Sequence, residues 1–339
     1  MLSRRKMLVI ALAFAFVHSG ILFAGFVAPY APTEQHRQYA YAPPTRLHFI
    51  GAEGHIHLRP FVYRSVPMEG EGFRYSEDRD SEYPVRCLTR EQDGFHLLAV
   101  GTPANLFLLG TDGYGRDIFS RILFGGRTSL LAAAVATLFA LLIGAVMGGI
   151  AGQFGGGVDS LVMRSSELVL ALPWIYLLLA IRASLPLHLD PARTLVLLSL
   201  VIGVMGWARP ARLIRGAVLS AKERPFVTAA RGFGASEWYL LRRHVLPQTL
   251  GIVTAQAVTL IPQFVAAEAT LSFLGLGIGE PVPSWGNMLS AFQQFSTVSS
   301  YWWMAFPLAA LIAVSLTYFV LADALHHAGA GIKSGQSYA

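Results

Sequence analysis

The stretch from Arg224 to Gln248, RPFVTAARGFGASEWYLLRRHVLPQ, is a polar, basic segment between apolar ones, and the rest of the chain can be placed around it. Pro225 suits the first position of a helix, because the N–H group that it lacks would have no partner there. Gly234 can take the positive φ that ends such a helix, and Ser236 can cap a second one. Pro247 is expected to close the second helix. The sequence therefore predicts two short helices joined at a glycine.

The first of these helices carries a narrow apolar stripe. Its apolar residues recur at i, i+3, i+4 and i+7, the spacing of one helical face: Phe226, Ala229, Ala230 and Phe233. In a loop between membrane spans, such a helix has a face to offer a soluble partner.

The composition indicates a protein that crosses a membrane several times. Of the 339 residues, 54% are hydrophobic and only 14% are charged, whereas soluble domains carry about a quarter of charged residues. The net charge of +6 is assigned to loop lysines and arginines, since nucleic-acid binding needs a clustered basic face. Cys87 is the only cysteine, which excludes an intrachain disulfide and a cysteine metal cluster.

Six apolar stretches are predicted to span the membrane: residues 7–28, 129–150, 167–187, 194–214, 250–274 and 301–321. The first is too long for the core of a signal peptide and matches a span of about 20 residues. Pro173 is expected to kink the third. Gly144, Gly148 and Gly152 in the second allow close helix packing.

Residues 29–110 are expected to form a small extracytoplasmic insertion that contains strands. Their prolines and mixed charges cannot lie in lipid, where backbone polar groups would be unpaired. The alternating runs 55–58 and 61–63 predict strands. His55 and His57 have the spacing of metal ligands on a strand, but solvated strand histidines are the expectation.

The opening stretch resembles the EAA loop of membrane subunits of binding-protein-dependent ABC importers, E-A-A-x3-G-x9-I-x-L-P. The matching positions are Ala229, Ala230, Gly234, Leu246 and Pro247, while Thr228 replaces the glutamate and His244 the isoleucine. The resemblance implies that the loop is cytoplasmic and docks in a groove of an ATPase subunit.

A second stretch, residues 109–130, resembles the signature GTDxxGRDxxSRxxxGxRxSL of the same family. Every fixed position is filled: Gly110, Thr111, Asp112, Gly115, Arg116, Asp117, Ser120, Arg121, Gly125, Arg127, Ser129 and Leu130. Asp112 and Gly113 predict a turn, and Asp117 is expected in the first turn of a helix, where negative charge is favoured. At the outer membrane surface, these side chains either anchor the loop and lipid headgroups or contact substrate.

Two further stretches, 163–173 and 268–288, resemble motifs of the dipeptide, oligopeptide and nickel branch. Glu268 is the one carboxylate well inside an apolar span, and such residues are functional candidates. It either lines the peptide path or pairs structurally with Arg182, and the pair is favoured. Trp285 either contacts a binding protein or, more commonly for such a residue, anchors at the membrane interface.

The resemblance implies an all-α type I importer permease with six transmembrane helices, the second permease of a pair. Its parts are a first span (1–28), the insertion (29–110), a core (111–325) with the coupling loop (224–248), and a cytoplasmic tail (326–339). Thirteen lysines and arginines fall on one side of the membrane and two on the other, outside residues 29–127. This asymmetry places both termini in the cytoplasm.

The implied partners are a homologous second permease, two ABC ATPases, an extracytoplasmic binding protein for peptides, and membrane lipid. The chain carries no G-x-x-x-x-G-K-S/T phosphate loop, so it is expected to be no enzyme and to bind no cofactor, with ATP and Mg held by partners. Nickel or another small solute is the alternative cargo. A secondary transporter would need repeated halves, and a membrane-anchored enzyme or sensor would have to use residues 29–110.

Overall fold

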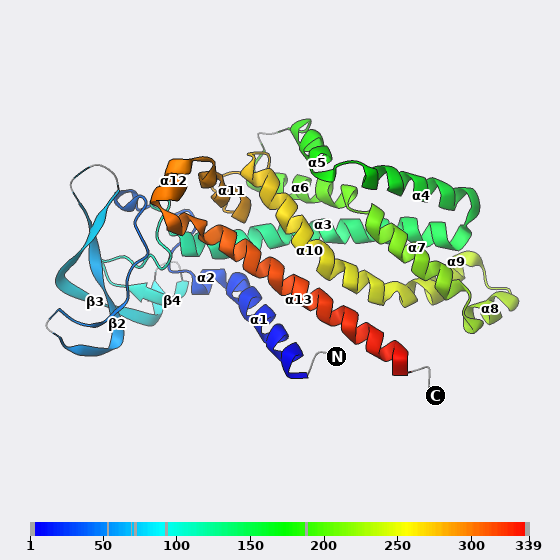
Figure 1. Cartoon of the computed structure of the whole chain (residues 1–339), viewed down its shortest axis with the longest axis horizontal. Coiled ribbons are helices and arrows are strands. Elements are labelled where there is room, and N and C mark those ends of the chain that lie inside the picture. Colours follow the sequence, from blue (N-terminus) through cyan, green and yellow to red (C-terminus); the bar gives the residue numbers. More distant parts are fainter. Residues whose placement is uncertain are drawn as a thin grey trace. The chain divides into compact units, whose positions relative to one another are not determined.

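The computed structural model describes residues 4–52, 54–68, 70, 73–91, 94–186 and 189–335. They divide into two compact units, each described here by itself. The first unit comprises Met1–Ala13, Leu130–Leu271 and Val314–Ala339, and the second comprises Phe14–Ser129 and Ser272–Ala313. Figure 1 labels the helices α1–α13 and the strands β2, β3 and β4.

The first unit is helical. Its elements are the later part of α3 (Ile118–Phe154), α4 (Gly156–Ala171), α5 (Trp174–Ala183), α6 (Pro191–Met205), α7 (Ala208–Lys222), α8 (Pro225–Gly232), α9 (Glu237–Leu240), α10 (Leu250–Phe273) and the later part of α13 (Phe306–Gly335).

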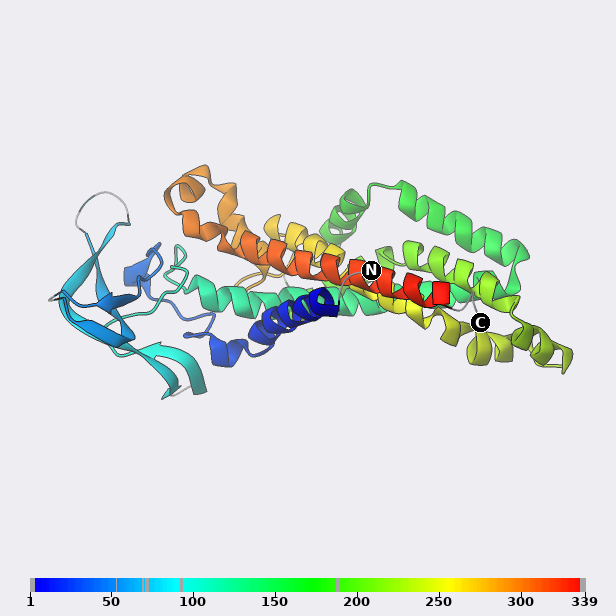
Figure 2. The same cartoon turned by 60° about the horizontal axis from the view of Figure 1, so that its bottom comes forward.

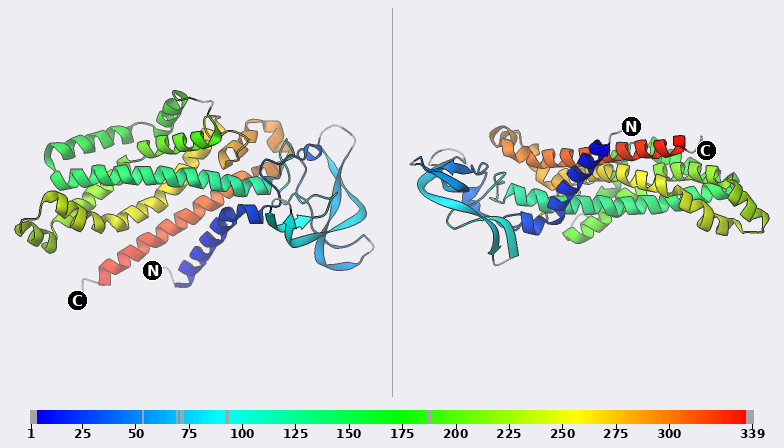
Figure 3. Two further views of the ribbon diagram at one scale, coloured as in Figure 1. Left: turned by 180° about the vertical axis from the view of Figure 1, so that it is seen from behind. Right: turned by 90° about the horizontal axis from the view of Figure 1, so that it is seen from below.

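Glycines on α3 form the contact with α7, which runs alongside it (Figure 3). A Cβ on Gly144 would lie 2.7 Å from Cβ of Pro210, and one on Gly152 would lie 2.7 Å from a side-chain carbon of Val218. At Gly148 it would overlap the backbone of Ala211. The predicted close packing at these glycines is therefore confirmed, and its partner is α7.

Two of the predicted spans are broken rather than continuous. Helices α4 and α5 meet at 88°, and α6 and α7 meet at 48°; Figure 2 shows the sharp turn between α4 and α5. The first break falls at Pro173, whose ring cannot continue the preceding helix. The prediction of a merely kinked span over 167–187 was wrong, because the chain turns by 88° at Pro173. Helix α4 also begins earlier than the predicted span, at Gly156, and residue 187 lies outside the described residues.

By length and composition, three helices of the described chain can each cross a membrane, or five if each bent pair counts as one span. The apolar part of α1 (Arg4–Leu22) is shorter, because the helix stops before α2 (Ala24–Val27). The predicted span 7–28 is thus interrupted at Phe23. Helix α13 continues to Gly335, so the predicted tail is helical that far; residues 1–3 and 336–339 lie outside the described residues.

The second unit contains an antiparallel sheet of four strands in sequence order: β1 (His48–Ile50), β2 (Ile56–Pro67), β3 (Tyr75–Glu91) and β4 (Gly94–Val100). The prediction of strands in the insertion is confirmed. Val62 and Val85 pack with Ala104 and Leu106 behind the sheet. His57 lies 3.2 Å from a carboxylate oxygen of Glu82 on the neighbouring strand.

The helical part of the second unit is organised around Trp285, the first residue of α11 (Trp285–Leu289). Its side chain is fully buried, and its indole N–H donates to the carbonyl of Ile122 at 3.0 Å. Trp285 is therefore a core residue, neither an interfacial anchor nor an exposed contact. The loop before α11 is closed by a capping box in which Ser284 and Asn287 bond to each other's backbone.

Gly148→Ala is expected to destabilise the protein by about 1–3 kcal/mol, because the added methyl group forces α3 away from α7. Thermal unfolding of the detergent-solubilised protein measures it. Gly216→Ala is the matched control: this glycine is inside α7 and has open space around it. There alanine should be neutral or stabilising by up to about 1 kcal/mol. Equal shifts for both variants would contradict the packing argument.

Candidate functional sites

The coupling loop 224–248 has the predicted two-helix form. Pro225 is the first residue of α8, and Gly234, with φ of 85°, follows the end of that helix. The Ser236 hydroxyl accepts the backbone N–H of Tyr239 at 3.3 Å and caps α9. Local sequence alone therefore accounts for both helix starts and for the elbow between them.

The face of α8 that packs inward differs from the predicted stripe. Val227 is the buried residue, in a cluster with Ile214 and Val218 of α7 and with Leu240 and Leu241. Phe226 remains 43% exposed and Phe233 93% exposed. Thr228 and Ala229 are exposed, whereas Ala230 is partly buried against the cluster. Three of the four stripe residues thus face outward, as expected of a face offered to a partner, while Ala230 packs against the cluster.

Pro247 does not end the second helix, contrary to the expectation. The chain continues from α9 through a π-helical segment (Leu241–Val245) and a 3₁₀ turn (Leu246–Thr249) into α10. The change of helix type at Leu246 accommodates a residue that has no N–H to donate. Leu246 is partly buried and Pro247 is exposed.

Polar contacts fasten the loop to the end of α3. The Lys222 ammonium donates to the carbonyls of Gly152 and Gln153 at 3.2 and 2.6 Å, where the last carbonyls of a helix need donors. The Gln153 amide donates to Glu237, which also accepts from Arg231 Nε at 2.9 Å. Glu237 therefore joins α8, α9 and α3, a role that sequence analysis missed because Glu237 lies at a variable position of the motif.

Glu268 and Arg182 are both buried, in α10 and α5 of the first unit. Arg182 donates from Nη1 to the carbonyl of Pro186 at 3.1 Å. The structural pair of Glu268 and Arg182 stays a prediction, as does the peptide path.

A cavity of about 230 Å³ lies where the first unit's helices are interrupted. Its wall includes Leu172 and Trp174 on either side of Pro173, and Gly206 between α6 and α7. Phe264, just after Pro262 within α10, closes a third side. Arg209 and Gln263 are its polar members. Neither Glu268 nor Arg182 belongs to this wall.

The signature begins with a tight turn built on Asp112. Its carboxylate oxygen Oδ1 accepts the backbone N–H groups of Tyr114 and Arg116 at 2.9 and 3.1 Å. Gly115, with φ of 73°, lets the chain pass His36, whose carbonyl a Cβ at this position would strike. The predicted turn is confirmed, and its glycine is required by both conformation and space.

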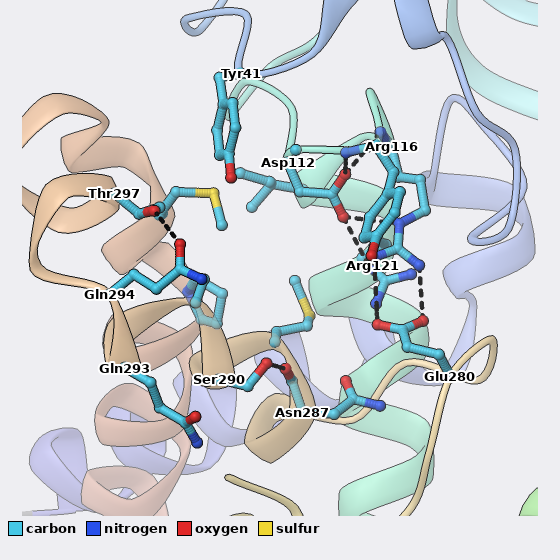
Figure 4. Close-up of a pocket in the computed structure, with 17 residues that line it drawn as sticks. Tyr41, Asp112, Arg116, Arg121, Glu280, Asn287, Ser290, Gln293, Gln294 and Thr297 are labelled. Carbon is cyan, nitrogen blue, oxygen red and sulfur yellow. Dashed lines mark hydrogen bonds and ion pairs between the residues drawn. The ribbon is translucent and has the colours of Figure 1, made fainter. Parts of the chain in front are cut away.

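Two buried arginines of the signature converge on Glu280 (Figure 4). Arg116 donates to its two carboxylate oxygens at 2.7 and 3.2 Å, and Arg121 donates to one of them at 2.8 Å. Arg116 Nε also donates to Asp112 at 2.7 Å. Sequence analysis missed Glu280, although this acidic residue lies inside the matched stretch 268–288.

A cavity of about 330 Å³ adjoins this ion-pair cluster within the second unit. Besides the charged residues, polar side chains from several elements line it (Figure 4): Tyr41, Asn287, Ser290, Gln293, Gln294 and Thr297. Arginines with amide and hydroxyl groups around a hollow of this size can hold a small, polar, negatively charged group.

Asp117 lies one residue before α3 and caps it, rather than lying in its first turn. Its Oδ2 accepts the backbone N–H and hydroxyl of Ser120 at 2.7 and 2.6 Å. Burial raises the pKa of this carboxyl from 3.8 to about 7, against the lowering effect of those hydrogen bonds. The expected gain from negative charge at the helix start is therefore outweighed by desolvation.

Asp117 should make stability depend on pH. Because the pKa in the folded state, about 7, exceeds the 3.8 of the free side chain, the folded protein retains a proton that the unfolded chain loses. The contribution of the Asp117 carboxyl to stability is complete below a pH of 3.8 and is lost as the pH rises through about 7. Asp117→Asn can still cap α3 and cannot ionise. Its melting temperature relative to wild type should rise between these values and level off above them; a constant difference would contradict the assignment.

Comparison with known proteins gives consistent matches. The family described as "Binding-protein-dependent transport system inner membrane component" matches residues 140–328. A dipeptide transport system permease protein of Bacillus subtilis is 40% identical over 65% of this chain and 67% of its own length. A putative peptide permease protein of Brucella suis is 36% identical over 73% and 80%. An oligopeptide transport system permease protein of Haemophilus influenzae is 33% identical over 74% of both.

Proposed function

The chain belongs to the family of inner-membrane components of binding-protein-dependent transport systems, and from this premise we propose that it forms half of the translocation path of an ATP-driven peptide importer. The family consists of transport permeases, not enzymes. The observation that carries the proposal is the loop 224–248, a two-helix element that turns apolar side chains outward and is fastened to α3 and α7 by packing and hydrogen bonds.

Peptides are the favoured cargo because similar proteins from three bacteria are described as dipeptide, oligopeptide or peptide permeases. Nickel or another small solute is the alternative. The proposed complex contains a homologous second permease, two ABC ATPases that hold ATP and Mg, and an extracytoplasmic binding protein that delivers the peptide.

We expect the movement of the ATPase to reach the permease through α8. Phe226 and Phe233 offer the apolar contact for an ATPase groove, and Thr228 supplies a hydroxyl where the family motif has a carboxylate. The loop is coupled to α7 by the buried cluster around Val227 and to α3 by the hydrogen bonds of Lys222 and Glu237. Movement of the loop is therefore expected to move both helices with it. Interfaces that are packed in this way switch between discrete arrangements rather than bending gradually.

The path for the solute is proposed to include the cavity at the helix breaks. Interrupted helices at a cavity are a common feature of transporter sites, because unwound backbone there can face water or solute. Arg209 and Gln263 are the polar side chains at that position. Glu268 and Arg182 are secondary candidates, buried elsewhere in the same unit.

The proposed orientation places residues 29–127 outside the cell and both termini in the cytoplasm. Cys87, the chain's only cysteine, is exposed on β3. A membrane-impermeant maleimide should therefore label Cys87 in intact spheroplasts. In the control, Cys87→Ser with Thr228→Cys, labelling should occur only after permeabilisation. The opposite pattern would reverse the orientation.

The function is tested by reconstituting the copurified complex with its binding protein and measuring ATP-dependent dipeptide uptake into proteoliposomes. Phe233→Asp should abolish uptake and weaken ATPase copurification, because a charge replaces an exposed apolar contact without touching the core. Phe295→Asp, at a similarly exposed phenylalanine of α12 (Phe295–Ser300), should retain the ATPase. Uptake without ATP, or normal uptake by Phe233→Asp, would overturn the coupling role.

A further inference from the structure

Two of the three arginines of the signature, Arg116 and Arg121, form a binding site for one carboxylate, here called the seat. Both oxygens of Glu280 are engaged: one by Arg116 Nη1 at 2.7 Å, the other by Arg116 Nη2 at 3.2 Å and Arg121 Nη2 at 2.8 Å. Paired donors from the planar end of Arg116 are the recognition geometry that guanidinium groups offer to carboxylates.

The arginines are the fixed part of this seat and Glu280 is the replaceable part. Arg121 and Arg116 are 1% and 7% exposed, and other groups hold them: the carbonyl of Pro32 at 3.2 Å and Asp112 at 2.7 Å. The Glu280 side chain is 45% exposed and belongs to the loop between α10 and α11. Exchange of one carboxylate for another would keep the charge-assisted hydrogen bonds, so its cost in free energy is small.

The cavity beside the seat suits the rest of a small peptide. Its volume of about 330 Å³ lies within the range of small-molecule sites. Gln294 contributes an amide that can donate to and accept from peptide groups, and Thr297 adds a hydroxyl that lies 3.4 Å from it. The amides of Asn287 and Gln293 already donate to backbone carbonyls of Ile278, Val282 and Phe273. Gln294 and Thr297 lie on the side of the hollow opposite the arginines in Figure 4.

We propose that Arg116 and Arg121 form a binding site for the C-terminal carboxylate of a peptide, and that Glu280 occupies this site in the absence of peptide. The inference rests on the proposed peptide function and adds to it a point of recognition within the permease itself. Glu280 then acts as an internal competitor that keeps two buried cations paired until a peptide arrives.

The test uses the copurified permease–ATPase complex in lipid nanodiscs, without binding protein, and two probes: dialanine and its C-terminal amide. Glu280→Gln removes the competing charge and should lower the Kd for dialanine at least about tenfold, the factor expected for one charge-assisted hydrogen bond. The Kd of the amide should not change. Glu280→Ala should show the same preference, which separates the effect from bonds made by the new glutamine.

Asp190→Asn is the matched control. Asp190 pairs with Arg193 at 3.0 Å at the start of α6, and asparagine retains the cap. It should leave both Kd values unchanged. An equal gain with Asp190→Asn, or an equal gain for dialanine and its amide, would overturn the proposal.

Two further outcomes are decisive. If Glu280→Gln lowers the Kd of the complex for the binding protein and leaves the Kd for dialanine unchanged, the seat binds an acidic side chain of that protein. The peptide proposal then fails. If wild type imports dipeptide while Glu280→Gln shows no carboxylate preference, this inference alone fails. If no peptide is imported, the proposed function fails as well.

Discussion

The contact between α3 and α7 is possible because α3 presents hydrogen atoms where other residues carry side chains. At Gly148 a methyl group would occupy the position of the Ala211 backbone, and one turn to either side the space is nearly as tight. In lipid, where apolar side chains gain little by leaving one neighbour for another, such close approach is the main source of helix association. The cluster around Val227, and Lys222 of α7 with its hydrogen bonds to carbonyls at the end of α3, then extend this contact to the coupling loop.

In the second unit, ion pairs hold the elements together, as close helix packing does in the first. The signature brings two arginines and two aspartates together, and Glu280 supplies a third carboxylate to the cluster. Burying cations requires that they be paired. The two acidic partners of Arg116 differ in how firmly they are held. Asp112 is fixed by hydrogen bonds within its own turn, whereas Glu280 belongs to a loop and its side chain is 45% exposed.

Residues whose behaviour is local were predictable from sequence. Pro225, Gly234, Ser236 and the turn at Asp112 take the conformations that their own chemistry favours. The burial of Val227 was not, because this residue is buried by packing against α7. Trp285 was misjudged for the same reason: a tryptophan in an outer loop looks interfacial until its partner at Ile122, far away in sequence, is known.

The helix breaks were underestimated because a single proline signals both a kink and a full turn. Pro173 separates helices that meet at 88°, whereas Pro247 lies in a helical stretch that continues past it. Sequence alone does not distinguish the two, since the surroundings decide whether freed backbone groups find other partners. Glu280 was missed for a related reason, because its ion pairs span more than 150 positions of the chain.

The π-helical segment from Leu241 to Val245 has a geometric consequence for α10. The wide π-helical turn gives less rotation per residue than an α-helix, whereas the 3₁₀ turn from Leu246 to Thr249, with 3.0 residues per turn, gives more. The two irregular turns therefore act in opposite directions on the orientation of α10, the helix that carries Glu268. A change in either turn alone would rotate α10 about its own axis relative to α9.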